Sequence, residues 1–109
     1  PAKLGNAGSF FKNPVIDKKQ FQELQTQYPQ IPHYRVNKEA VKVPAGWLIE
    51  QAGWKGKVVG NTGSHKDQAL VLVNYGHATG SEIWQLAMEI QRSVKAKFGI
   101  ELSPEVNII

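Results

Sequence analysis

The segment from residue 79 to residue 99 constrains the fold most, because it predicts one long amphipathic helix. Thr79 is a favourable N-cap, and Glu82 three residues later completes a capping box. Gly99 stands where a left-handed residue ends a helix. The apolar residues between them recur at helical spacing: Ile83, Leu86, Ala87, Ile90, Val94 and Phe98. An apolar stripe of this kind must be covered by another layer of structure.

Two shorter helices and several short strands are predicted to supply that layer. Asp17 begins the first helix, with Gln20 as its capping-box partner, and Pro29 ends it. The second helix is expected over residues 45–52, before Gly53. A hairpin is expected to pair residues 34–36 with 41–43 around 37–40. The remaining expected strands are residues 15–16, 57–60, 69–74, 100–102 and 106–109, with a loop over 61–68.

The pattern favours an α+β fold over a doubly wound sheet, because the strands are short and include a hairpin. The apolar run over residues 69–74 predicts the central strand of its sheet. A chain of 109 residues is one domain by length. We therefore expect a small single domain over residues 1–109, with a mostly antiparallel sheet packed by two to three helices.

Composition narrows the functional classes. The chain has no cysteine, so disulfides and thiolate metal sites are excluded, and its three histidines lack metal-ligand spacing. No apolar run approaches the roughly 20 residues of a membrane span. The net charge is +4, but the lysines are dispersed rather than clustered. We expect a cytoplasmic protein without metal, membrane or nucleic-acid binding, whose mild positive charge suits an anionic substrate.

The segment Gly5-Asn6-Ala7-Gly8-Ser9-Phe10-Phe11-Lys12-Asn13-Pro14 is the main candidate for a functional loop. Its two glycines allow positive φ and close approach of a ligand, and successive N–H groups in such a turn can cradle an anion. Ser9 stands where that cradle ends. The alternative is a connector without a ligand, in which Ser9 bonds its own backbone.

Four separated segments together resemble one protein family. They are the decapeptide at 5–14, Pro44-Ala45-Gly46-Trp47-Leu48-Ile49-Glu50, the block of Gly60-Asn61-Thr62-Gly63 with His65 and residues 68–72, and Pro104-Glu105-Val106. In this order they resemble the C-terminal part of the UDP-N-acetylenolpyruvoylglucosamine reductase family. That family makes UDP-N-acetylmuramate for bacterial peptidoglycan.

The resemblance implies an oxidoreductase that uses FAD and NADPH to reduce UDP-N-acetylglucosamine enolpyruvate. The family holds FAD on two N-terminal domains, which this chain does not include. The chain therefore resembles the substrate-binding domain alone. We expect no bound cofactor and no reductase activity from it in isolation.

The resemblance also suggests roles for six residues. Ser9 matches the family's proton donor, and Glu105 matches its catalytic glutamate, which stabilises or protonates the enol intermediate. For that work the pKa of Glu105 should be raised by burial. Both roles require the N- and C-terminal segments to be neighbours in the fold.

Four more residues are candidates for substrate binding. Asn13 and Gln68 match family positions that contact the nucleotide end of the substrate. Their amide side chains suit this role because they both donate and accept hydrogen bonds. Lys12 could approach a phosphate or be a solvated lysine. Tyr34 could lie against the nucleotide or have a core or hairpin role.

Two other functional classes remain open from the sequence. One is a stand-alone module that binds nucleotides or nucleic acid, which would need lysines and aromatic residues on one face. The other is an accessory domain without a ligand, in which the glycine-rich segment is only a turn.

Overall fold

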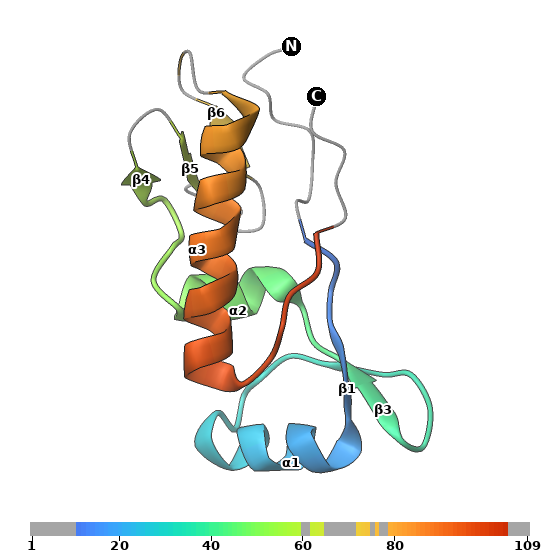
Figure 1. Cartoon of the computed structure of the whole chain (residues 1–109). Coiled ribbons are helices and arrows are strands. Elements are labelled where there is room, and N and C mark those ends of the chain that lie inside the picture. The colour runs from blue at the N-terminus through green and yellow to red at the C-terminus, as the bar shows by residue number, and fades with distance from the viewer. Residues whose placement is uncertain (1–10, 60–61, 65–71, 75, 77–78, 105–109) are drawn as a thin grey trace.

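The computed structural model describes residues 11–59, 62–64, 72–74, 76 and 79–104, and these residues form an α+β fold (Figure 1). Helix α3 (Gly80–Phe98) is the longest element, and α2 (Ala45–Gln51) packs against it. Helix α1 (Lys18–Gln27) packs against strands β1 (Val15–Asp17) and β3 (Ala40–Lys42). The predicted fold class is confirmed, although the strands divide into two three-stranded antiparallel sheets.

Helix α3 forms as its sequence predicts. The Glu82 amide donates to Thr79 Oγ1 at 3.1 Å, and the Thr79 amide donates to Glu82 Oε1 at 3.0 Å, which completes the capping box. Gly99 has φ 70° and ends the helix. The predicted stripe is buried except at Ile83, which is partly buried. No described helix combines the length and apolar character that crossing a membrane requires.

The first sheet contains the predicted hairpin. Its order is β1-β3-β2, where β2 is Tyr34–Arg35, and both pairings are antiparallel. Asn37 Oδ1 accepts from the Glu39 amide at 2.8 Å and shapes the turn between β2 and β3. One register row joins Ile16, Val41 and Arg35 across the sheet, and the neighbouring row joins Val15, Lys42 and Tyr34. Because successive residues point to opposite faces, these rows lie on opposite faces.

The second sheet corrects two predictions. Its order is β4 (Val58–Val59), β5 (Thr62–Ser64) and β6 (Leu72–Asn74). Strand β5 lies inside the stretch 61–68 that was predicted to be a loop. It is also the middle strand of the described sheet, a place predicted for residues 69–74. Contacts with α3 and burial of all three β5 residues outweigh the low strand propensity of its glycine and serine.

The ends of helices α1 and α3 bring a third correction. Asp17 caps α1 as predicted, since its Oδ1 accepts from the Gln20 amide at 2.7 Å. The Gln20 side chain, however, does not complete a capping box: its Nε2 donates to the Gly99 carbonyl at 3.2 Å. A carbonyl at the end of α3 would otherwise lack an intrahelical partner, so the long-range bond replaces the local one.

The predicted strand over residues 100–102 is also wrong. This segment runs as irregular chain along α3, with Ile100 and Leu102 buried in the core. Gln91 Nε2 donates to the Leu102 carbonyl at 2.6 Å. A side chain of α3 therefore satisfies a backbone group that a neighbouring strand would otherwise have bonded.

Three aromatic rings connect the three helices. Tyr28 follows α1, Trp47 lies in α2 and Phe98 ends α3. Their ring centroids are 5.2 Å apart for Tyr28 and Phe98, 5.7 Å for Tyr28 and Trp47, and 5.8 Å for Trp47 and Phe98. Tilted and edge-on rings at such distances attract one another beyond simple burial. We therefore infer that the contacts within this aromatic cluster hold the end of α1 against α2 and α3.

Replacing Phe98 by alanine should lower the free energy of unfolding by about 3–5 kcal/mol, because it removes a buried ring and leaves a cavity. Urea denaturation followed by tryptophan fluorescence measures the change. The exposed Arg92 of α3 provides the control, and Arg92→Ala should stay within about 0.5 kcal/mol of the parent. If Phe98→Ala changed stability no more than the control does, the aromatic cluster would not be what holds α1 against the other two helices.

Candidate functional site

The two ends of the described chain meet in one place, which we call the terminal crossing. Phe11 and Pro104 form an antiparallel bridge, and the Lys12 amide donates to the Ser103 carbonyl at 2.8 Å. In Figure 1 the blue start and the red end of the described chain lie side by side there. Phe11 is only 1% exposed, so its ring anchors the crossing in the core.

The C-terminal side of the crossing is held firmly. Leu102 is buried, and its carbonyl accepts the hydrogen bond from Gln91 of α3. Glu101 also forms an ion pair with Lys95 of α3 at 3.6 Å, although both side chains are largely exposed. Such an exposed pair adds little energy. Burial of Leu102 and the Gln91 bond are therefore the main restraints on the segment that leads to residue 104.

Asn13 links the N-terminal segment to helix α2. Its Oδ1 accepts from the Ala45 amide at 2.9 Å, at the first residue of α2. The N-cap residue of that helix is Pro44, which forms no side-chain cap of its own. Asn13 thus caps α2 from 32 positions earlier in the chain. Its Nδ2 donors have no partner among the described residues and remain able to bind a ligand.

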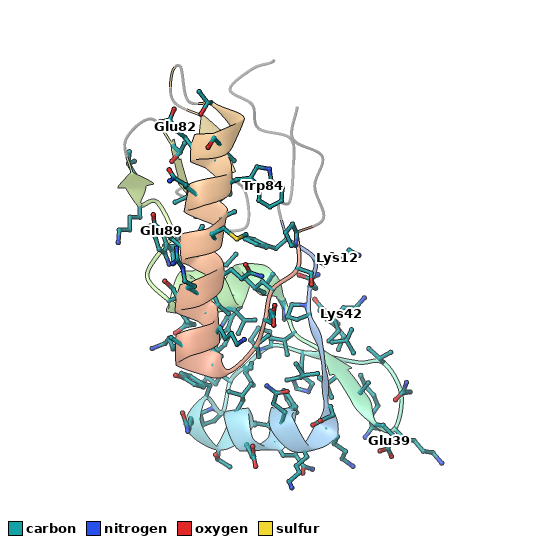
Figure 2. The ribbon with its side chains drawn as sticks, in the orientation of Figure 1. Lys12, Glu39, Lys42, Glu82, Trp84 and Glu89 are labelled. Atoms are coloured by element: carbon teal, nitrogen blue, oxygen red, sulfur yellow. The ribbon has the colours of Figure 1, made fainter. Side chains whose placement is uncertain are left out.

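The face of the first sheet that carries Val15, Lys42 and Tyr34 points away from α1, and we call it the outer face. Tyr34 is 62% exposed, so the core role left open by the sequence is wrong and the hairpin role is right. Lys42 stands between Val15 and Tyr34 in the register. Figure 2 shows Lys12 and Lys42 projecting from the same side of the molecule.

Lys12 at the terminal crossing and Lys42 on the outer face each place a positive charge on this side of the molecule. Lys12 and Lys42 are exposed, and neither forms an ion pair with any carboxylate that the structure describes. Two unpaired cations beside amide and phenol donors form a suitable environment for an anionic, oxygen-rich ligand.

The structure describes three of the six predicted site residues: Lys12 and Asn13 follow Phe11 at the terminal crossing, and Tyr34 lies beside Lys42 on the outer face. Ser9, Gln68 and Glu105 lie outside the described residues. Sequence reasoning missed Lys42. Strand alternation predicts only that Lys42 lies on the other face of the sheet from Val41 and Val43. The register that pairs Lys42 with Tyr34 is what relates it to the candidate site.

The described residues contain no group of three histidine, cysteine, aspartate or glutamate side chains placed to hold a metal ion.

Comparison with known proteins gives consistent matches over the chain. The family model for the C-terminal domain of UDP-N-acetylenolpyruvoylglucosamine reductase matches residues 1–109. A reductase of that name from Porphyromonas gingivalis is 58% identical over 109 residues, which are 100% of this chain and 32% of the relative. The one from Flavobacterium johnsoniae is 55% identical, again with 100% and 32% coverage. The chain spans about a third of the length of these curated relatives.

Two substitutions at Asn13 separate its capping role from its free donors. Asn13→Ala removes the acceptor for the Ala45 amide and should lower the free energy of unfolding by about 1 kcal/mol. Asn13→Asp keeps the acceptor and adds a negative charge at a helix N-terminus, so stability should be unchanged or slightly higher. Urea denaturation of both variants measures this. Equal destabilisation by alanine and aspartate would contradict the capping role.

Proposed function

The chain belongs to the C-terminal domain family of UDP-N-acetylenolpyruvoylglucosamine reductase, and from that premise we propose that it is the substrate-binding and proton-donating domain of such an enzyme. The substrate would be UDP-N-acetylglucosamine enolpyruvate, and the product UDP-N-acetylmuramate for peptidoglycan. The observation that carries the proposal is the terminal crossing, because it joins the two chain segments that lead to the candidate catalytic residues.

The catalytic roles are assigned to Ser9 and Glu105. Ser9 is two residues before Phe11, and Glu105 is one residue after Pro104, so each stands next to the crossing in sequence. A proton donor and a carboxylate that act on one double bond must approach it from neighbouring segments. The pairing of Phe11 with Pro104 meets this requirement for the segments and so supports the assignment.

The nucleotide end of the substrate would lie over the outer face. The free Nδ2 of Asn13 can donate to a phosphate oxygen, and Lys12 and Lys42 can neutralise the charge of the diphosphate. The exposed Tyr34 ring offers a flat surface and a hydroxyl donor. Gln68 is assigned to the same end of the substrate by family position.

We assign no residue of this chain to FAD or NADPH. The cofactors would bind to the part of the protein that the relatives have beyond this chain. When bound, FAD that has been reduced by NADPH supplies a hydride to one carbon of the enolpyruvyl double bond.

The chain's own residues would then complete the reduction. The Ser9 hydroxyl gives its proton to the carbon next to the one that receives the hydride, which leaves an alkoxide to be reprotonated. Glu105 stabilises the enol form of the intermediate from the other segment. Serine is a poor acid at its ordinary pKa, so the site must stabilise the alkoxide or relay a proton to it.

In the complete enzyme, Ser9→Ala should leave reduction of the flavin by NADPH nearly unchanged and slow its reoxidation by substrate by about 10²–10⁴-fold. Hydride reaches the flavin before the substrate needs a proton, so only the second half-reaction depends on Ser9. Stopped-flow absorbance measures the two half-reactions separately, with Ser93→Ala in α3 as the control. Equal slowing of both half-reactions would show that Ser9 has only a structural role in its loop.

Lys42→Gln should weaken substrate binding by about three- to ten-fold, because it removes one solvent-exposed charge-assisted contact to the diphosphate. The rate constant at saturating substrate should change little, because Lys42 is assigned to the nucleotide end of the substrate and not to its reacting carbons. Steady-state kinetics and titration with UDP measure both quantities. The exposed Lys19 of α1 is the control, and Lys19→Gln should have no such effect. Unchanged affinity in Lys42→Gln would remove the outer face from the proposed site.

A further inference from the structure

A pocket of about 210 Å³ lies between helix α1 and the β2–β3 hairpin. It opens on the α1 side of the first sheet, and Val41 and Arg35 of one register row line it. The outer face carries the alternate row with Lys42 and Tyr34. The pocket and the proposed substrate site are therefore on opposite faces of the same sheet.

The floor of the pocket is apolar and well packed. Phe21 and Val41 are buried, and the His33 ring lies tilted against Phe21 with centroids 4.5 Å apart. His33 Nδ1 lies 3.0 Å from the Ile31 carbonyl oxygen, which can only accept, so Nδ1 carries a proton and donates. The ring is thus held by two contacts.

The rim of the pocket is cationic. Lys18 comes from the first turn of α1, Arg35 from β2 and Lys38 from the hairpin turn. None of the three forms an ion pair with a carboxylate in the part of the chain that the structure describes. The acidic neighbours Asp17 and Glu39 do not line the pocket. Three like charges from separate elements repel one another unless an anion lies between them.

The uncharged hydrogen-bond donors and the size of the pocket indicate which kind of anion could bind there. Gln22 and Gln25 bring amide groups from α1. Asn37 uses its Oδ1 for the Glu39 amide, so its NH₂ group remains to donate. Typical sites for drug-sized ligands are roughly 300–1,000 Å³, so this pocket suits a small anion rather than a whole nucleotide.

We propose that this pocket binds a phosphate group, held by Lys18, Arg35 and Lys38 over the Phe21–His33 floor. The phosphate would be either inorganic phosphate or the phosphate end of a small phosphorylated compound. Arg35 is the principal ligand, because its guanidinium can form two parallel hydrogen bonds to phosphate oxygens. The proposal is independent of the substrate site on the outer face.

The test is an NMR titration of the intact protein that contains this chain, with ¹⁵N-labelled histidine. His33→Gln identifies the His33 ring signals. Inorganic phosphate and glycerol 3-phosphate are added separately at constant ionic strength, with chloride as the reference anion. Saturable shifts of the His33 signals are expected with one or both probes. Tighter binding of glycerol 3-phosphate would identify an ester as the natural source, and equal or tighter binding of phosphate would identify the free anion.

Variants decide where the anion binds. Arg35→Gln should weaken phosphate binding about ten-fold, whereas Lys19→Gln, which removes a neighbouring exposed charge outside the lining, should change it less than two-fold. Arg35 is exposed on the hairpin, and thermal unfolding should confirm that the variant stays folded. The proposal is overturned if His33 does not respond, or if Arg35→Gln and Lys19→Gln have equal effects. It is also overturned if Lys42→Gln, on the outer face, abolishes the response while Arg35→Gln preserves it.

Discussion

The rest of the structure depends on how the segment from Phe11 to Asp17 is held on both of its edges. On one edge the Lys12 amide donates to the Ser103 carbonyl, so the C-terminal segment runs beside it. On the other edge the Val43 amide donates to the Pro14 carbonyl at 2.9 Å, and the β1–β3 ladder continues from there. Asn13 extends that ladder with its side chain to reach the start of α2. One short segment therefore connects the first sheet, helix α2 and the C-terminal segment.

This arrangement holds the two segments that lead to the proposed catalytic residues next to each other. The crossing is formed by backbone hydrogen bonds and by the buried ring of Phe11, which do not depend on a ligand. Helix α3 stabilises the C-terminal side of the crossing, because its Gln91 donates a hydrogen bond to the carbonyl of the buried Leu102. A junction supported in this way would preorganise the proposed site, as proton transfer to carbon requires. The sheet then presents different chemistry on its two faces, because Tyr34 and Lys42 alternate with Arg35 and Val41.

The features predicted most accurately from the sequence are the helix ends, because residues a few positions apart determine them. The capping box of Thr79 and Glu82, the left-handed Gly99 and the cap at Asp17 all follow from spacings of a few residues. The long-range bonds could not be read in the same way. Gln20 has the right position for a capping box but bonds to Gly99, 79 residues away. Strand β5 has a sequence typical of a loop and becomes a strand because α3 and two neighbouring strands cover it. Lys42 joined the candidate site only through the hairpin register.

Ser9 and Glu105 are proposed to act in one catalytic site, and a double-mutant cycle measures whether they do. Ser9→Ala, Glu105→Gln and the double variant would be made in the complete enzyme, and the rate of flavin reoxidation by substrate measured for each. Residues that act together on one intermediate have strongly non-additive effects. If the two residues share one site, the double variant should be about as slow as the slower single variant. Rate losses that simply multiply would show that Ser9 and Glu105 act independently, and would contradict a shared site at the terminal crossing.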